Sequence, residues 1–384
     1  MKSKNLKKLL KKSFPHKLLT IFSAVFSKYI FNIFIRNIKY PDIRENSVLL
    51  IEFYNVHGET LPGFIKYLLD LNFNVDVVLN KDNKGRNDFG LFSEFILNEK
   101  TRIISLSGFD INYLLRSVKI KKYRHIIINT YTNSCESDYL AFVNMKKLQP
   151  VCVVHNSDLK NKYFKSNKII SLVNIKSNNR KPTIVVNSHY FCNINKRLYK
   201  GNESNIVTFT ALNKKSLFRR NLNLLFSACD ALYKKGITNF IVKVIGKGIP
   251  VPECYKNNII DYGFLDFQAM YKEIIDSDFF LALIDQESVQ YKNKASGSYQ
   301  ISYGFLKPII LHSQFAEISN LDNTNSILYN NNNELPDAME KCINMSNNEY
   351  SSIVNNLEET EKKIYILSLN NLKETLDLPL KYEK

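Results

Sequence analysis

The sequence alternates apolar runs of strand length with segments of helical spacing, and it does so twice. This alternation restricts the fold more than any other feature. In the first half the apolar runs lie at 47–53, 74–79, 102–106, 125–129, 150–155 and 183–187, and helices are predicted at 61–71, 89–97, 110–118 and 137–147. In the second half the runs lie at 206–210, 240–245, 258–262, 279–284, 309–311 and 326–329, and helices are predicted at 221–234, 266–275, 298–305 and 335–345. Strands that alternate with helices form parallel sheets joined by right-handed crossovers. The sequence therefore predicts an α/β protein with two parallel-sheet domains.

The length of 384 residues also favours two domains. We expect a first domain at 46–190, a linker at 191–204 and a second domain at 205–345. A basic arm at 1–45 precedes them, and helices at 346–384 close the chain.

Positive charge is concentrated at the start of the chain. The formal net charge is +17, and residues 1–40 contain ten Lys or Arg and no Asp or Glu. Residues 17–36 have one apolar face with several aromatic side chains, which is typical of a basic amphipathic helix lying in a membrane surface. The alternative is that this face packs on the next domain. Because the charge is not interleaved with exposed aromatic residues along the body, a nucleic-acid partner is not expected.

The cysteines point to a reducing compartment. The six cysteines are scattered and form no C-x-x-C pair, which disfavours a disulfide framework or a zinc site and fits the cytoplasm. Lys28 interrupts the apolar region of the arm, so a cleaved signal peptide is not expected. No apolar run reaches transmembrane length.

Three segments after strands of the second half suit a phosphate group. They are Arg219-Arg220 after the first strand, Gly246-Lys247-Gly248 after the second, and Ser296-Gly297-Ser298 after the fourth. Parallel strands place their carboxyl ends on one edge, and basic side chains with helix N-terminal amides there suit a diphosphate. Each segment alone is also typical of a solvated turn.

His57 and Glu59 are the candidate acid–base residues. They lie in the loop after the first strand, and either side chain could take a proton from a hydroxyl group. The alternative for His57 is a strand-end histidine bonded to backbone. His155, with Asn156, is a weaker candidate on the same edge. No metal site is predicted. Asp276-Ser277-Asp278 has the Asp-x-Asp pattern that can hold a divalent metal, but it lies where a helix enters a strand, at the edge of the sheet opposite to the predicted phosphate site.

The second half of the chain resembles the GT-B glycosyltransferases, especially the bacterial enzymes of surface-polysaccharide (lipopolysaccharide and capsule) synthesis. The resemblance rests on residues 218–222 around Arg219, on Val244-Ile245-Gly246-Lys247-Gly248, and on the run from Ser296-Gly297-Ser298 to Lys307-Pro308. Many retaining members have two glutamates seven residues apart in the last of these segments. This sequence has Gln300 and no such pair.

The resemblance implies two Rossmann-like domains that face each other across a cleft. The second would bind a nucleotide-sugar, as a substrate rather than a cofactor, through Arg219, Lys247, Gly248, Ser296, Gly297, Ser298 and Gln300. His57 or Glu59 would act on a lipid-linked glycan acceptor, without a metal. The arm would hold the protein at the inner face of the cytoplasmic membrane. A nucleotide-sugar epimerase of the same fold and a catalytically inactive membrane-associated assembly partner remain alternatives.

Overall fold

The computed structural model describes residues 40–82, 89–132, 135, 148–155, 168–174, 184–191, 206–213, 220–288, 291–292 and 294–378. The predicted basic helix at the N-terminus, the predicted helix at 137–147, Asn156 and Arg219 lie outside these residues.

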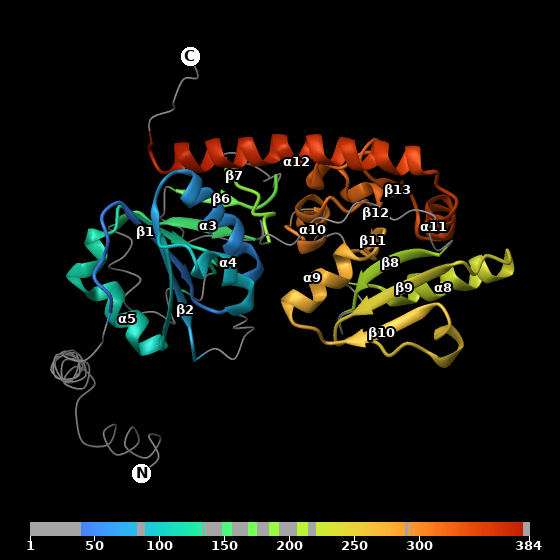
Figure 1. Cartoon of the computed structure of the whole chain (residues 1–384), viewed down its shortest axis with the longest axis horizontal. Helices are drawn as coiled ribbons and strands as arrows, with labels where there is room; N and C mark the ends of the chain where they lie inside the picture. Colours follow the sequence, from blue (N-terminus) through green and yellow to red (C-terminus); the bar gives the residue numbers. More distant parts are fainter. Residues whose placement is uncertain are drawn as a thin grey trace, which may run out of the picture.

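The first domain is built on a seven-stranded parallel sheet in the order β3-β2-β1-β4-β5-β6-β7 (Figure 1). Its strands are β1 Ser47–Glu52, β2 Asn74–Asn80, β3 Thr101–Leu106, β4 His125–Ile128, β5 Val151–Val154, β6 Ile169–Ser171 and β7 Ile184–Val185. Every residue of β1 is buried, which explains why this strand is a continuous apolar run. The strand order reverses between β1 and β4, so the loop after β1 opens at a switch point, where parallel sheets bind ligands.

Short helices connect these strands. They are α3 Leu61–Asp70, α4 Ser93–Ile96 and α5 Gly108–Arg116, with 3-10 turns η2 Gly58–Thr60, η3 Phe89–Phe92 and η4 Val118–Lys122. Pro62 lies in the first turn of α3, where its missing N–H costs nothing. A capping box starts α5: the Ser107 hydroxyl accepts from the Asp110 amide, and the Asp110 carboxylate accepts from the Ser107 amide.

The second domain has a six-stranded parallel sheet in the order β10-β9-β8-β11-β12-β13. Its strands are β8 Val207–Leu212, β9 Phe240–Ile245, β10 Ile259–Gly263, β11 Phe279–Leu281, β12 Ile309–His312 and β13 Ile327–Tyr329. Its helices are α8 Leu222–Lys234, α9 Phe267–Ile275, α10 Gly297–Phe305 and α11 Leu335–Ile343. The side chains of Asn221, Asp266 and Ser296 cap α8, α9 and α10, so each helix begins at or beside the residue that the sequence predicted. The strand order reverses between β8 and β11, which places a second switch point opposite the first.

One long helix, α12 (Asn347–Thr375), crosses both domains (Figure 1). Near its start, Tyr350 donates a hydrogen bond to the carbonyl of Asp278 in the second domain, at 2.9 Å. Near its end, the Ser368 hydroxyl accepts from the backbone N–H of Asn187 at 3.0 Å, and the side chain of Asn371 donates to the Val185 carbonyl at 2.8 Å. The helix therefore ties the two sheets together.

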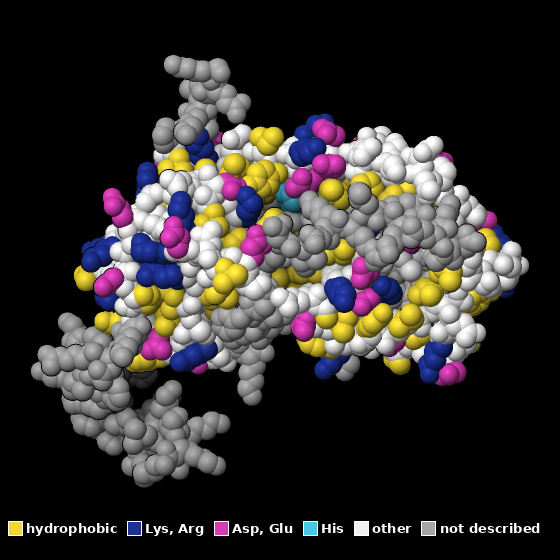
Figure 2. All heavy atoms as spheres, viewed as in Figure 1, with side chains coloured by type: hydrophobic (Ala, Val, Ile, Leu, Met, Phe, Trp, Pro, Cys, Tyr) yellow, Lys and Arg dark blue, Asp and Glu magenta, His cyan; other side chains and the backbone are white. Residues whose placement is uncertain are grey.

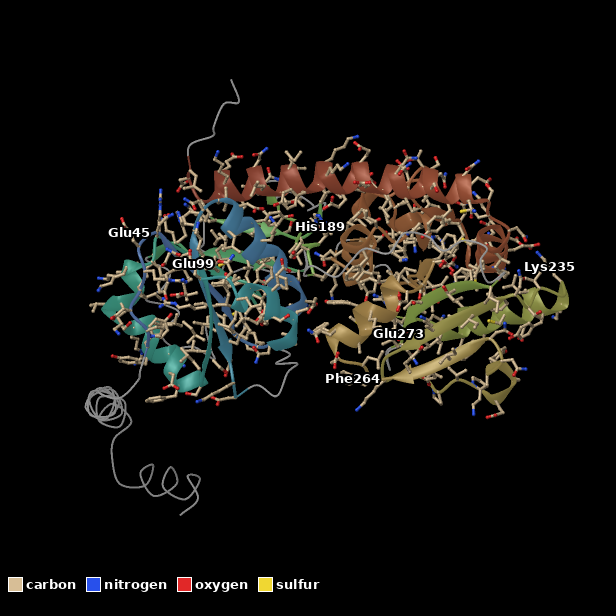
Figure 3. The ribbon with its side chains drawn as sticks, in the orientation of Figure 1. Glu45, Glu99, His189, Lys235, Phe264 and Glu273 are labelled. Carbon is tan, nitrogen blue, oxygen red and sulfur yellow. The ribbon has the colours of Figure 1, made fainter. Side chains whose placement is uncertain are left out.

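The chain between the domains is packed rather than exposed where the structure describes it. Residues 187–189 and Phe191 are buried, and a single apolar cluster runs from the first sheet through Phe191 to α9, α10 and α12. A Cβ at Gly304 would overlap the His189 carbonyl, so only glycine lets α10 approach this segment so closely. Figure 3 shows His189 at the junction of the domains beneath α12, where its Nε2 lies 2.8 Å from Oε1 of Glu361.

The predicted fold class is confirmed, with two parallel sheets in two α/β domains. One strand, β6, was not predicted, because Ser171 interrupts the apolar run at 169–173. No helix in the described ranges is long and apolar enough to cross a membrane. None of the cysteines within those ranges forms a disulfide.

Candidate functional site

A cleft of about 550 Å³ lies between the carboxyl edges of the two sheets. The first domain contributes the loop Asn55–Glu59 and Phe191. The second domain contributes the ends of β8 and β9, Arg220, the segment after β10, and the start of α10. Its lining residues are Asn55, Val56, His57, Gly58, Glu59, Phe191, Leu212, Asn213, Arg220, Ile245, Gly246, Lys247, Phe264, Leu265, Phe267, Met270, Tyr271, Tyr291, Gly297 and Ile301.

Arg220 is the buried cation of the cleft. Its Nη2 donates to the Ser298 hydroxyl at 2.7 Å and to the Ser296 hydroxyl at 3.3 Å, and its guanidinium lies over the Tyr291 ring, 5.8 Å from the centroid. These contacts fix a planar cation beside the N-terminus of α10. Ser296 and Ser298, whose backbone amides were predicted to hold the diphosphate, have buried side chains, and their hydroxyls accept from Arg220.

The first turn of α10 leaves space on its cleft side. A Cβ at Gly297 would meet no atom within 4 Å. Ile301, one turn later, lines the same cleft. Because the helix N-terminus carries unpaired amides and a partial positive charge, this open space suits an anion.

Gly246 and Gly248 shape the turn after β9. Gly246 has φ +128°, and a Cβ on either glycine would overlap Asn213. The Asn213 side chain in turn donates to the Ile249 carbonyl at 2.9 Å. The turn therefore presents Lys247 to the cleft, whereas Gly248 is needed for packing and does not line it.

Apolar side chains after β10 form another wall, which the sequence analysis did not identify. Phe264 and Leu265 follow the strand, and Phe267 and Met270 begin α9. Phe264 keeps 47% of its surface exposed, and Lys247 Nζ lies 5.5 Å from its ring centroid. Figure 3 shows Phe264 just beyond the end of β10. A phenylalanine directly after a predicted strand was the available signal, and an aromatic ring there offers a flat apolar surface to a ligand.

Gln300 was predicted to bind the donor, but it does not line the cleft. Its side chain is buried, and its amide nitrogen has no hydrogen-bond partner within the described part of the chain. Gly297 and Ile301, which are four residues apart, line the cleft from one face of α10. Binding of the donor by Gln300 stays a prediction.

His57 and Glu59 form a hydrogen-bonded pair at the opposite wall. The imidazole Nδ1 lies 3.1 Å from Oε1 of Glu59, and both residues line the cleft. Burial by itself would lower the pKa of His57, but the hydrogen bond to Glu59 and the charges of Glu59 and Glu52 outweigh burial and raise the pKa above its ordinary value. His57 therefore holds a proton more readily than an ordinary histidine does.

His155 supports His57 from behind. The two rings stack with centroids 3.9 Å apart. Nε2 of His155 donates to the Asn129 carbonyl at 2.9 Å, which fixes its tautomer. Burial, together with the charge of His57, holds the pKa of His155 well below its ordinary value, so this ring stays neutral. The His155 carbonyl also accepts from the amide of Ala295 at 3.2 Å, which joins this wall to the residue before the α10 cap.

Buried polar groups hold the His57 loop. The Glu52 carboxylate is fully buried and accepts from Asn129 Nδ2 and Thr130 Oγ1, each at 2.6 Å. Asn129 Nδ2 also lies 3.0 Å from the His57 carbonyl. This network links the end of β1, the end of β4 and the loop in one arrangement. The sequence analysis did not identify Glu52, because a carboxylate at a strand end looks like a boundary.

Asp278, in the Asp276-Ser277-Asp278 segment where no metal site was predicted, has a structural role. Its carboxylate accepts from the amide and the hydroxyl of Thr208, both at 2.8 Å. Within the described ranges, no group of three or more His, Cys, Asp or Glu side chains is arranged to hold a metal ion.

Solved structures share this architecture across most of the chain. HepE from Anabaena, solved with UDP and glucose, has a TM-score of 0.56 and 12% identity, covering 87% of this chain and 100% of that one. A variant of S. aureus TarM, solved with fondaparinux, α-GlcNAc-glycerol and UDP, has a TM-score of 0.55 and 9% identity, covering 85% and 99%. An E. coli structure described as trehalose-6-phosphate bound with UDP-2-fluoro glucose has a TM-score of 0.50 and 12% identity, covering 86% and 99%.

These likenesses confirm the GT-B fold expected from the sequence. No protein-family model and no curated protein sequence matches the chain.

Proposed function

We propose that this protein is a glycosyltransferase that moves a sugar from a nucleotide-sugar to a hydroxyl group of a glycan acceptor. The observation that carries the proposal is the composition of the cleft. Arg220, Lys247 and the α10 N-terminus lie on one wall, and the His57–Glu59 pair lies on the other. The HepE and TarM structures contain UDP, which supports a uridine nucleotide as the first ligand to test.

In this proposal the second domain holds the donor. The diphosphate lies in the space beside Gly297, where α10 amides and the Arg220 guanidinium donate hydrogen bonds to its oxygens. Lys247 adds a second cation from the turn after β9. The nucleobase lies against Phe264 and Leu265. The negative charge of the leaving diphosphate is balanced by these fixed groups, which is the role that a metal ion plays in other transferases.

The first domain acts on the acceptor. In a single displacement the acceptor oxygen attacks the anomeric carbon, the bond from that carbon to the diphosphate breaks, and the hydroxyl proton passes to His57 or Glu59. The raised pKa of His57 suits this transfer, because Glu59 stabilises the imidazolium that forms when His57 takes the proton. The neutral His155 ring keeps the His57 imidazole in one plane at the cleft.

The acceptor class and the location of the protein complete the proposal. We place the protein on the inner face of the cytoplasmic membrane, held by the basic residues 1–36, with a lipid-linked glycan as acceptor and a surface polysaccharide as product. The ten Lys or Arg among residues 1–40 support an anionic surface as partner. They give no support to a nucleic-acid partner, because the charge is concentrated in this segment and is not interleaved with exposed aromatic residues along the body.

The test is a panel of nucleoside diphosphates and nucleotide-sugars, scored first by the rise in melting temperature and then by release of nucleoside diphosphate. A glycosyltransferase is stabilised by one nucleotide-sugar and releases its diphosphate faster when acceptor is added. If no member of the panel raises the melting temperature, the proposal is wrong.

Two alternatives give different results in this assay. An epimerase of the same fold converts the nucleotide-sugar to its epimer without any acceptor, and nuclear magnetic resonance of the products distinguishes the two reactions. A catalytically inactive partner binds the nucleotide and turns over nothing. The His57–Glu59 pair in the cleft favours catalysis over the inactive alternative.

A further inference from the structure

The C-terminal end of α5 and the turn η4 form a basic surface with exposed apolar side chains. Residues 116–124 contain five Lys or Arg and no Asp or Glu. Arg116, Lys121 and Lys122 are exposed, and Val118 between them keeps 76% of its surface exposed. Phe109, in the first turn of α5, keeps 53% exposed. We call these five residues the α5–η4 surface.

α5 contains one carboxylate, that of Asp110, which follows Phe109 in the first turn and is committed to the capping box with Ser107. The cations at the helix C-terminus complement the helix dipole, but that role needs no exposed valine beside them. Figure 2 shows dark blue and yellow side chains, with some magenta ones among them, at the end of the molecule where α5 lies in Figure 1.

The basic N-terminal segment joins the body beside this surface. Tyr40, the first described residue, makes a hydrogen bond with the Tyr123 hydroxyl at 2.5 Å. Its carbonyl accepts from Lys119 Nζ at 3.4 Å. Tyr40 therefore joins the first 39 residues, which contain ten Lys or Arg, to the described chain beside η4. The α5–η4 surface and the segment before Tyr40 thus carry charge of the same sign.

We propose that the α5–η4 surface docks on an anionic lipid bilayer, as a second contact beside the one proposed for residues 1–36. Lysines meet lipid headgroups, while Val118 and Phe109 enter the boundary between headgroups and acyl chains. Nucleic acid is disfavoured as the occupant, because strand binding relies on stacked aromatic rings along a groove and this convex turn exposes a valine. The inference rests on the membrane placement proposed above and is independent of sugar transfer.

The experiment compares the full-length protein with K121E/K122E. Both lysines are exposed and lie far from the cleft lining. The control is K256E/K272E, which makes the same charge change on the second domain. Affinity is measured by co-sedimentation with vesicles of phosphatidylcholine alone and of phosphatidylcholine and phosphatidylglycerol in equal parts. A matched sample with single-stranded oligonucleotide in place of vesicles tests nucleic acid as the partner of this surface.

We expect K121E/K122E to bind the mixed vesicles at least about tenfold more weakly than the unaltered protein, and the control to bind within about twofold of it. Hydrogen exchange of the full-length protein should also slow in residues 116–124 when mixed vesicles are added. The inference is overturned if both variants lose the same affinity for mixed vesicles, or if neither loses any. It is also overturned if K121E/K122E weakens oligonucleotide binding as much as vesicle binding. Nucleotide-dependent stabilisation of K121E/K122E is measured alongside, so a failure here is distinguished from a failure of the proposed transferase.

Discussion

The imidazole of His57 lies nearly flat on that of His155, with ring centroids 3.9 Å apart and planes inclined by 19°. The two rings have opposite pKa displacements: that of His57 is raised and that of His155 is lowered. Two adjacent imidazoles cannot both carry charge at low cost, so one ring titrates and the other supports it. The hydrogen bond from His57 to Glu59 decides which ring takes the proton.

Replacing Glu59 by Gln should therefore lower the pKa of His57. The carboxylate charge is lost, and burial then dominates. If neutral His57 accepts the proton, the rate rises with pH through this pKa, and E59Q should move that rise to lower pH. The measurement is the pH dependence of kcat/KM for diphosphate release. If the rise of kcat/KM with pH lies at the same pH in E59Q as in the unaltered protein, His57 is not the base.

The same pair has an effect on stability with a defined sign. Because the folded-state pKa of His57 is raised, its pairing with Glu59 stabilises the protein fully at pH below the unfolded-state pKa. This contribution is lost as pH rises through the folded-state pKa. The difference in free energy of unfolding between the unaltered protein and E59Q should thus shrink as pH rises. Urea unfolding at several pH values measures it, and a difference that grows with pH would contradict the assignment.

Replacing Glu52 by Gln should destabilise the first domain. The buried carboxylate accepts from Asn129, Thr130 and the Tyr54 amide. A glutamine turns an NH₂ group toward at least one of these donors, which costs about 1–3 kcal/mol for an unsatisfied buried group. Urea unfolding measures the cost, with the exposed Glu99 changed to Gln as control. If E52Q is as stable as E99Q, the network does not hold the loop.

The parallel-sheet fold was predictable because it depends on apolar periodicity, and β1 or β9 shows that pattern without reference to the rest of the chain. His57, Glu59 and Lys247 were also predictable, because residues just after parallel strands gather at one edge. The face that α10 presents to the cleft was not predictable, since Gln300 and Ile301 differ only in rotation about the helix. The roles of Glu52 and His155 depend on contacts between β1, β4 and β5, which are distant in sequence.

Arg220 should contribute more to diphosphate affinity than any other cation of the cleft. Replacing it by Met removes charge-assisted hydrogen bonds of about 1.5–3 kcal/mol, which corresponds to roughly a tenfold to hundredfold weaker affinity for UDP. R220K retains the charge but cannot reach Ser296 and Ser298 in the same planar geometry, so we expect an intermediate loss. Isothermal titration calorimetry with UDP measures both, and K272M is the control. Unchanged affinity in R220M would place the diphosphate elsewhere.

Gly248 and Gly297 should respond in opposite ways to the same substitution. A Cβ at Gly248 would overlap the Asn213 side chain, so G248A should lower the free energy of unfolding by about 1–3 kcal/mol through overpacking. A Cβ at Gly297 meets only open space, so G297A should unfold within about 0.5 kcal/mol of the unaltered protein. Its methyl group, however, projects into the space assigned to the diphosphate. We expect G297A to bind UDP at least about tenfold more weakly, a loss of about 1.4 kcal/mol. Urea unfolding and calorimetry on the same two variants test the pair, and a G297A protein that binds UDP normally would exclude the α10 N-terminus as the diphosphate site.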